Sequence, residues 1–477
     1  MRRAGLVLLG VVLGGCVSPP SELPTRAPIA VEALGLSGQV QLPVADGWWR
    51  AYRDPQLDRI VERAIEGNPL LDLALARLRE ADARIGAARG PLYPGFSLDA
   101  TEQRSRLSEH DVIPPPYGGR WIWRGEVAVN LSWDLDFWGR QASIVQAASA
   151  NADAAALDRE TARLVLAGAL SRSYMQLDHA YRALDLAQRT LSLREAEADL
   201  VRKRVDAGLD TTLELRRAQG AVPSARVQVS EAQAAIERAV HALATLSGQG
   251  AASYGEIVRP TLDPDVAPPL PAALPANLLA RRPDVIAARW RIEASDARRL
   301  AARAAFYPDV DLSAFAGFGA IGLDKLFVGD SLQMGIGPRL HLPLFDARRL
   351  KAEYREANAA VDAAVAQYNA TVLFAVQQVA DQLTALQAAQ REQVDEQLAL
   401  EHAQEVRRIA AGRQRAGLGT RLQVLDAEAG VIQAQRSLLD RREALSQARV
   451  ALLLSLGGSF DPDAPSTIRA DVAQVSP

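Results

Sequence analysis

The sequence predicts a mainly helical protein with a smaller β component, built from two structural repeats that each hold a strand pair and a long helical hairpin. Apolar residues return at helical spacing over very long segments, and period-two alternation interrupts them twice. Both patterns also recur at a nearly constant offset. The longest helical pattern runs without a proline from 347 to about 412. At about 1.5 Å per residue this helix is roughly 100 Å long, more than a compact globular core needs.

The duplication is clearest in two short motifs. The turn sequence Arg-x-x-Ala-Gly-Leu-x-Thr occurs around Gly208 and again around Gly417, at an offset of 209 residues (417 − 208). A Tyr-Pro pair ends at Pro94 and again at Pro308, at an offset of 214 residues (308 − 94). The difference places a short insertion in the first repeat, between its Tyr-Pro pair and its long helix. We therefore expect an internal duplication.

The first sixteen residues have the pattern of a secretory signal. Two arginines precede the apolar run 4–13, and two glycines precede Cys16. The run is too short to cross a bilayer as a helix. Cys16 is the only cysteine of the chain, which excludes an intrachain disulfide. No later run of about eighteen apolar residues exists, so we expect any further membrane crossing to use strands.

Residues 17–47 are rich in proline and small residues and are predicted to form an extended tether. The first repeat, 48–250, begins with helical patterns and continues with a strand pair at about 94–137. It ends with a helical hairpin at about 140–248, whose tip is the glycine turn at Gly208.

A proline-rich linker, 251–275, leads to the second repeat, 276–457. This repeat contains a helical pattern, a strand pair at about 308–345 and a helical hairpin at about 347–457. The turn at Gly417 marks the tip of the second hairpin.

The four predicted strands alternate apolar and polar residues, so each has one apolar and one polar face. The apolar face of the longest strand carries Trp121, Trp123, Val127, Val129, Leu131 and Trp133. A soluble sandwich would show the same alternation. However, strands inserted between long helices, in a chain with an export signal, favour a location in a membrane. Four strands cannot close a membrane barrel, which starts at about eight, so identical chains must associate.

The composition points to neither an enzyme nor a nucleic-acid-binding protein. The formal net charge is −3, which provides no global basic field for nucleic acid. The five histidines lack metal-ligand spacing, and no phosphate-loop, hydrolase or zinc-protease motif is present. The run Gly317–Gly322 spells a dinucleotide fingerprint, but period-two alternation brackets it and no periodic helix begins there. We expect no catalytic activity and no cofactor.

These features together resemble the TolC-like outer-membrane efflux proteins, and more narrowly their lipoprotein branch in tripartite systems driven by RND-type pumps. The resemblance rests on the signal ending at Cys16, the duplicated plan, the two Arg-x-x-Ala-Gly-Leu-x-Thr tips and the strand ends at 133–140 and 342–346. It implies a mainly α fold with β, in which a homotrimer forms a twelve-stranded barrel in the outer membrane and a twelve-helix periplasmic tunnel. A belt around the tunnel would draw on residues near 30–55 and 250–275 and on the C-terminal tail, 458–477.

The resemblance also implies a place in the cell and a set of partners. Leu13-Gly14-Gly15-Cys16 is similar to a lipobox, so Cys16 would carry a covalent lipid after cleavage. An ordinary signal peptide is the alternative. Val17-Ser18 lack the aspartate that retains lipoproteins at the inner membrane, which favours the outer membrane. The expected partners are outer-membrane lipid, a periplasmic adaptor and an inner-membrane RND-type pump, and the expected function is a passive exit duct for small molecules.

In this family the adaptor docks on the helical tips, and each tip glycine should end one helix while the threonine caps the next. The matching residues are Arg204, Ala207, Gly208, Leu209 and Thr211 in the first tip, and Arg413, Ala416, Gly417, Leu418 and Thr420 in the second. These residues have a simpler alternative role as turn formers alone.

Related channels close their periplasmic end with the pattern Leu-x-x-x-Asp, which Leu422 and Asp426 match here. One helical turn separates the two residues, so both can face the lumen. Three copies of Asp426 would form an acidic ring that favours cations. Ala429 stands where such channels carry an arginine, and Arg217, at the position equivalent to Asp426 in the first repeat, is the candidate replacement. The alternative is an aspartate on a solvated helix surface.

Two other functions stay open at the level of sequence. One is the outer-membrane channel of a type I protein secretion system, which shares the same tube. The other is a coiled-coil scaffold lipoprotein that forms no channel. Drugs, metals, siderophores and solvents are all compatible with the predicted tunnel.

Overall fold

A computed structural model of the chain describes residues 20–30, 46–110, 112–113, 116–262, 281–343, 345–458 and 460. The predicted signal with Cys16, most of the tether, the linker from 263 onward and nearly all of the C-terminal tail lie outside the described residues. The chain divides into two compact units. One comprises Met1–Pro28, Arg77–Ala155 and Ala287–Tyr368, and the other comprises Ile29–Ala76, Ala156–Ile286 and Asn369–Pro477.

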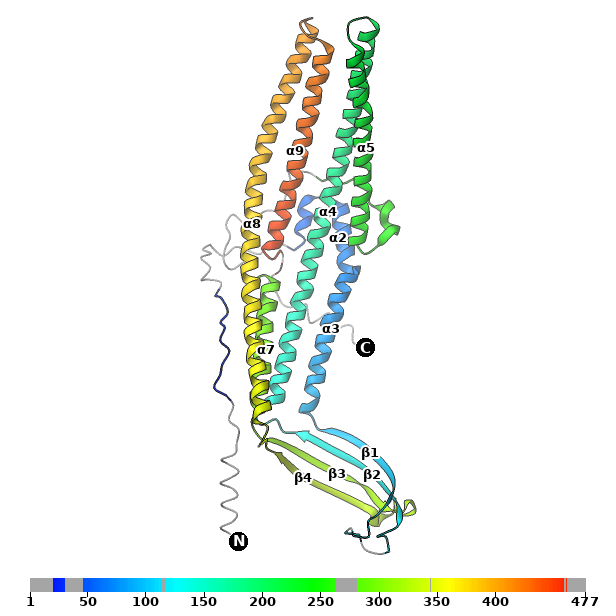
Figure 1. Cartoon of the computed structure of the whole chain (residues 1–477), viewed down its shortest axis with the longest axis vertical. Coiled ribbons are helices and arrows are strands. Elements are labelled where there is room, and N and C mark those ends of the chain that lie inside the picture. Colours follow the sequence, from blue (N-terminus) through cyan, green and yellow to red (C-terminus); the bar gives the residue numbers. More distant parts are fainter. Residues whose placement is uncertain are drawn as a thin grey trace. The chain divides into compact units, whose positions relative to one another are not determined.

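Helices dominate the described chain, as the sequence predicts (Figure 1). The α-helices are α2 (Pro55–Gly67), α3 (Pro69–Arg89), α4 (Arg140–Asp206), α5 (Thr212–Leu246), α7 (Pro283–Ala304), α8 (Ala347–Arg415) and α9 (Arg421–Ser455). Short 3-10 helices are η2 (Trp48–Tyr52), η3 (Gly90–Leu92), η4 (Gly250–Glu256), η5 (Leu323–Lys325) and η6 (Gly329–Ser331). The helices α4 and α8 have 67 and 69 residues, so each is about 100 Å long.

The four strands form one antiparallel sheet in the order β1-β2-β3-β4 (Figure 1). Their bounds are β1 (Gly95–Arg106), β2 (Trp121–Asp134), β3 (Asp309–Ile321) and β4 (Leu332–His341). The strand pairs of the two repeats therefore join through β2 and β3, and β1 and β4 are left as the edges. All four strands have the length that a tilted membrane strand requires, about 9–11 residues.

The register gathers apolar side chains on one face of this sheet. Phe96 pairs with Leu131, Leu131 with Ala314, and Ala314 with Ile336. The neighbouring residues on the same strands point to the opposite face. Phe96 and Ile336 are 69% and 78% exposed. The sheet thus presents a broad uncovered apolar face.

The opposite face of the sheet is polar. Asn130 donates to Asp99 Oδ2 at 2.7 Å, and the Ser97 hydroxyl donates to the same oxygen at 3.0 Å.

Gly317, the first glycine of the dinucleotide-like motif, lies inside β3 opposite Ala128. A Cβ atom there would lie 2.2 Å from the Val127 carbonyl oxygen, so this glycine allows β2 and β3 to approach and belongs to a strand.

Aromatic side chains mark both ends of the strands. At one end the guanidinium of Arg104 lies 5.8 Å and 5.5 Å from the ring centroids of Trp121 and Trp123. At the other end Trp138 stacks on Tyr307 with the ring centroids 4.7 Å apart. Aromatic residues at both ends of an apolar band are typical of membrane strands, because their amphipathic rings favour the two interfaces.

The second unit has its own core, which packs η2 and α2 against α4, α5 and α9. The buried Asp54 caps α2 and accepts hydrogen bonds from the backbone N–H groups of Gln56 and Thr261 and from the Tyr174 hydroxyl, at 2.9, 2.8 and 2.8 Å. Although burial disfavours the charged form, these three hydrogen bonds hold the pKa of Asp54 below its ordinary value.

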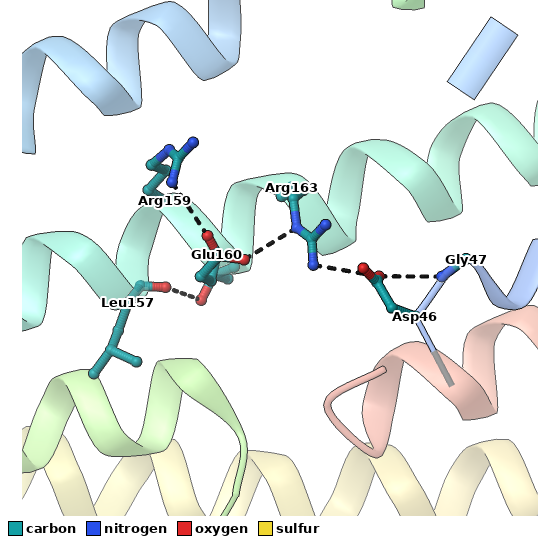
Figure 2. A network of polar contacts seen from close by, with 7 residues as sticks. Asp46, Gly47, Leu157, Arg159, Glu160 and Arg163 are labelled. Atoms are coloured by element: carbon teal, nitrogen blue, oxygen red, sulfur yellow. Dashed lines mark hydrogen bonds and ion pairs between the residues drawn. The ribbon is translucent and has the colours of Figure 1, made fainter. Parts of the chain in front are cut away.

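A polar network fixes the segment before η2 on α4 (Figure 2). Arg163 Nε lies 3.0 Å from Glu160 Oε2, and its Nη2 atom lies 3.4 Å from Asp46 Oδ1. The same Asp46 oxygen accepts from the Gly47 N–H at 3.1 Å. Arg163 therefore bridges α4 and the chain that leads into η2.

Candidate functional site

The predicted first tip is a tight turn between α4 and α5. Gly208 has φ +72°, in the left-handed region that glycine adopts without strain. Its N–H donates to the Val205 carbonyl at 2.9 Å, and the Leu209 N–H donates to the Arg204 carbonyl at 2.7 Å. These bonds complete the end of α4. Thr211 then caps α5, because its hydroxyl oxygen accepts from the backbone N–H of the third residue of that helix.

The second tip, between α8 and α9, has the same backbone. Gly417 has φ +74°, and the Leu418 N–H donates to the Arg413 carbonyl at 2.9 Å. Thr420 and Gln423 form a complete capping box, in which each side chain accepts from the backbone N–H of the other, at 3.3 and 3.0 Å. The repeated turn sequence therefore folds twice into the same turn.

A leucine lies exposed in each turn. Leu209 is 70% exposed and Leu418 is 71% exposed. Neither side chain contributes to the hydrophobic clusters of the described chain. Both leucines are therefore available for contact with another molecule.

The charges of the two tips differ. In the first tip, Arg204 Nε lies 3.0 Å from Asp210 Oδ2. The Thr211 N–H and Arg204 both donate to Asp210 and hold the pKa of its carboxyl below the ordinary value. In the second tip, Gly419 occupies the position of Asp210. Arg413 keeps only the bond to the Leu418 carbonyl oxygen, at 3.4 Å, which Arg204 also makes to the Leu209 carbonyl oxygen at 3.4 Å.

The predicted gate residues lie at the start of α9. Leu422 is half-buried and packs against a cluster that includes Val201 of α4 and Ala218 of α5. Asp426 is exposed. At 3.6 residues per turn the two side chains differ by about 40° around α9, so they share one face.

Arg217 does not meet Asp426 within the described chain. It forms an ion pair with Glu214, three residues away on α5, at 2.8 Å. Arg217 and Leu422 do line the same open groove, of about 570 Å³, between α4, α5 and the start of α9. The structure therefore brings two of the three predicted gate residues together and leaves Asp426 apart from Arg217.

A second groove lies between α4, α8 and α9. Its volume is about 950 Å³. Its charged lining residues are Arg189, Arg407, Arg408, Arg415, Arg421, Asp185 and Glu428. We refer to it as the arginine groove. The only hint in the sequence is the helical spacing of Arg407, Arg408 and Arg415, which puts them on one side of α8.

No group of three or more histidine, cysteine, aspartate or glutamate side chains in the described ranges of the chain is arranged to hold a metal ion. The dinucleotide-like motif lies within or directly after β3 and does not open an α-helix. The described features are surfaces and grooves of long helices.

Comparison with known proteins gives a consistent family. The profile described as outer membrane efflux protein matches residues 60–249 and 274–458. The fusaric acid resistance protein FusA of Burkholderia cepacia is 34% identical over 75% of this chain and 69% of its own length. The pyoverdine export outer membrane protein OpmQ of Pseudomonas putida is 31% identical over 98% of this chain and 99% of its own. Among solved structures, the outer membrane protein VceC from Vibrio cholerae matches with a TM-score of 0.79 and 34% identity, over 88% of this chain and 100% of its own.

Proposed function

The chain belongs to the outer membrane efflux protein family, and we propose that three copies of it form the passive exit duct of a tripartite efflux system. It is an outer-membrane efflux channel of the TolC-like type, with a part that extends into the periplasm. Beyond membership of the family, we propose the trimer, the gate, the docking residues, the lipid anchor and the nature of the energy source.

The observation that carries the association of several copies is the open sheet, and the number three comes from the resemblance to TolC-like proteins. β1 and β4 are its edges, and nearly every residue of β1 is exposed. Unpaired edges are not tolerated in lipid, and four strands are half of the smallest membrane barrel, which has about eight. Pairing of β4 in one copy with β1 in the next removes every edge. Three copies then supply a twelve-stranded barrel.

The long helices support the same assembly. Among the described helices, α8 alone is long and apolar enough to cross a membrane, judged by length and composition only. Only 28% of its most apolar stretch of 18 residues is buried. Exposed apolar residues on this helix include Leu373, Phe374, Val394, Leu398, Val406 and Ile409. Helices of neighbouring copies would cover this surface in a closed tunnel.

We expect small molecules as cargo and an RND-type pump with a periplasmic adaptor as the source of energy. The two relatives are named for resistance to fusaric acid and for export of pyoverdine, neither of which is a protein. This favours efflux over a type I protein secretion channel. A scaffold without a channel would leave the apolar sheet face unexplained.

Within this proposal the two tips dock the adaptor. Their exposed position supports this role, because the backbone of each turn is complete without a partner while the leucine stays uncovered. The proposed contact residues are Arg204, Ala207, Gly208, Leu209 and Thr211, together with Arg413, Ala416, Gly417, Leu418 and Thr420.

Leu422 and Asp426 are the proposed gate, because they share one face of α9 next to the second tip. Arg217 is committed to Glu214 in the single chain. Arg217 would therefore reach Asp426 only in a neighbouring copy or after that ion pair breaks.

The lipid on Cys16 is proposed as an additional anchor. An extended segment after it lies along α8: Arg355 Nε donates to Glu22 Oε2 at 3.1 Å, and the Thr25 N–H donates to Asp362 Oδ1 at 2.8 Å. Cys16 precedes Glu22 by six residues, a reach of about 20 Å. Since α8 closely follows β4, this segment supports a lipid position near the membrane strands.

The test is the mass and conductance of the detergent-solubilised assembly. We expect the mass of three chains and stepwise ionic conductance in planar lipid bilayers. A water-soluble monomer without conductance would contradict the duct, and a non-conducting assembly would favour the scaffold. Replacement of Cys16 by alanine should remove palmitate labelling and leave the assembled mass unchanged.

A further inference from the structure

We propose that neighbouring copies of the chain pair β4 with β1 in one fixed register, in which Arg339 of one copy forms an ion pair with Asp99 of the next. The inference rests on the proposed function, which requires the open sheet to close between copies. It adds the register of that closure and the residues that select it. We refer to the junction of β4 (Leu332–His341) in one copy with β1 (Gly95–Arg106) in the next as the seam.

The lengths of the two edge strands restrict the register of the seam. β1 has 12 residues and β4 has 10. Every residue of β4 therefore finds a partner only if His341 pairs with Gly95, Phe96 or Ser97 of the next copy. Pairing with Phe96 would place the polar face of one strand beside the apolar face of the other, because side chains alternate with a period of two. Two registers remain, which we call the Gly95 register and the Ser97 register after the partner of His341.

Both registers give the strand tilt of a membrane barrel. Within one chain, one row of the ladder runs across the four strands from Gly95 to Gly337. Across the seam, Gly337 would pair with Asp99 in the Gly95 register and with Thr101 in the Ser97 register, four or six residues beyond Gly95 (99 − 95 and 101 − 95). At about 3.3 Å per residue and about 4.8 Å per strand, these shifts give tilts of about 35° and 45°. Membrane strands tilt by about 35–45°, so geometry alone allows both registers.

The polar-face residues of the seam come closest to each other. Between β2 and β3 the hydrogen-bonded pairs belong to the apolar face, since the Leu135 N–H donates to the Val310 carbonyl at 3.1 Å. Backbone groups point alternately to the two sides of a strand, so the apolar-face residues of β4 point their backbone groups into the seam. The polar-face residues then form the non-hydrogen-bonded pairs of the seam, with Cα atoms only about 4.5 Å apart. Polar side chains of neighbouring copies can therefore pair directly.

Each edge strand has a single formal charge on its polar face, with His341 neutral, and the two charges are opposite. On β1 the charge is Asp99, whose Oδ2 atom accepts from Ser97 and Asn130 and whose Oδ1 atom accepts no hydrogen bond within the described chain. On β4 the charge is Arg339. It lies opposite Asp311 of β3, but its side chain forms no ion pair or hydrogen bond among the described residues. A second copy can therefore neutralise both charges.

These charges distinguish the two registers. In the Ser97 register Arg339 lies directly opposite Asp99 of the next copy. In the Gly95 register Arg339 lies opposite Ser97, and Asp99 lies opposite Gly337. Opposite charges stabilise a sheet most when they are directly opposite each other. The Ser97 register is therefore the favoured one.

A proline gives the side chains of the seam more weight. Pro338 of β4 pairs with Leu312 on the apolar face, so its nitrogen points into the seam. Proline has no N–H to donate, and the backbone ladder of the seam therefore lacks one hydrogen bond. Side-chain pairs then contribute a larger share of the free energy that selects the register.

Disulfide formation between copies tests the register. The double variant Ser97→Cys/His341→Cys places two cysteines directly opposite each other only in the Ser97 register, and oxidation should give a covalently closed trimer on a denaturing gel without reductant. Gly95→Cys/His341→Cys is the matched probe of the other register. In the Ser97 register its Cα atoms are more than about 7 Å apart, so its yield should be about tenfold lower. Wild-type chains and the single variants are controls, because Cys16 is the only cysteine of the wild type.

Reversal of the charges tests the ion pair. Arg339→Asp should accelerate dissociation of the detergent-solubilised trimer about tenfold at low salt, because like charges then face each other, and added salt should reduce the effect. The further change Asp99→Arg should return the rate to within about threefold of wild type. Arg124→Asp, on the polar face of the inner strand β2, is the matched control and should change the rate less than about twofold. An equal acceleration in this control, or no recovery after the double exchange, overturns the ion pair.

Failure of the inference is separable from failure of the proposed function. The mass and the planar-bilayer conductance of the same preparations report on the duct in either register. A conducting trimer that forms the disulfide of the Gly95 register, or neither disulfide, rejects only the proposed register. Chains that neither assemble nor conduct reject the duct and the register together.

Discussion

The two helical tips share one backbone and differ in charge. Both have a glycine near φ +73° (+72° and +74°), the same closing hydrogen bond to an arginine carbonyl and a threonine cap. In the first tip an aspartate neutralises the arginine, whereas in the second a glycine occupies the aspartate position. A turn of this kind requires its glycine and its cap, but no particular charge on its surface. The difference in charge therefore points to different contacts of the two tips.

Substitutions at the proposed gate should give the largest difference in channel behaviour between equivalent positions of the two repeats. Asp426→Ala removes three acidic groups from the proposed lumen ring without disturbing packing, because Asp426 is exposed. We expect a several-fold fall in the cation-to-anion permeability ratio in planar bilayers. Leu422→Ala should raise the closed-state leak.

Leu213 is the matched control, since it stands at the position equivalent to Leu422 in the first repeat (422 − 209). Leu213→Ala should leave the leak unchanged. An unchanged leak and ion selectivity in both α9 variants would remove the gate and leave Asp426 as a surface residue.

Substitution of the turn glycines should give the next largest effect. The loss of stability should be equal in the two tips. Gly208→Ala and Gly417→Ala each force a side chain into the left-handed region, at a cost of roughly 1–2 kcal/mol. No atom lies within 4 Å of the added methyl group in either case, so strain alone sets the cost. Amide hydrogen exchange in the last turns of α4 and α8 should accelerate by similar factors.

The control for this pair is a glycine inside a helix. Gly220 of α5 and Gly412 of α8 also have open space around them, and alanine there should stabilise by about 0.5–1 kcal/mol. Unequal effects of the two turn variants would show that one tip has a contact that the shared backbone does not explain.

Substitutions in the helix caps should reveal a smaller difference in stability between the two tips. Thr211→Ala and Thr420→Ala should each destabilise the following helix by about 1 kcal/mol. Gln423→Ala should add a further loss, because Gln423 accepts from the Thr420 N–H. Glu214→Ala, at the equivalent position, should lack that loss, since Glu214 pairs with Arg217 instead. Equal hydrogen-exchange effects of Gln423→Ala and Glu214→Ala in α9 and α5 would contradict this distinction.

Local patterns in the sequence predicted most of the fold, because each element carries its own signal. Alternation placed Phe96 and Ile336 on one face before any pairing was known, since the period of a strand leaves no other arrangement. The turn motif predicted both tips for the same reason. The arginine groove had no such signal, because its residues come from three helices that are distant in sequence. The contact of Arg217 with Asp426 across neighbouring helices stays a prediction, and within the single chain Arg217 pairs with Glu214, three residues away on the same helix.

Acidification should give the smallest difference in stability between the two tips. The loss should be confined to the first tip. The pKa of Asp210 is held below its ordinary value of 3.8 by the Thr211 N–H and by Arg204. The contribution of this carboxylate is therefore complete above pH 3.8 and is lost as the pH falls through the lowered pKa. Amides in the last turn of α4 should lose protection relative to those of α8 as the pH falls below 3.8, after correction for the intrinsic exchange rate.

Asp210→Gly copies the second tip into the first and isolates this carboxylate from the nearby pair of Lys203 and Asp199. We expect the variant to lose the extra acid sensitivity of α4 while its turn stays closed, because Gly208 and the Leu209 N–H bond are unchanged. If α4 keeps that sensitivity without Asp210, the acid response arises from Asp199. The charge difference between the tips would then have no energetic consequence for the turn, and its role would lie entirely in what each tip contacts.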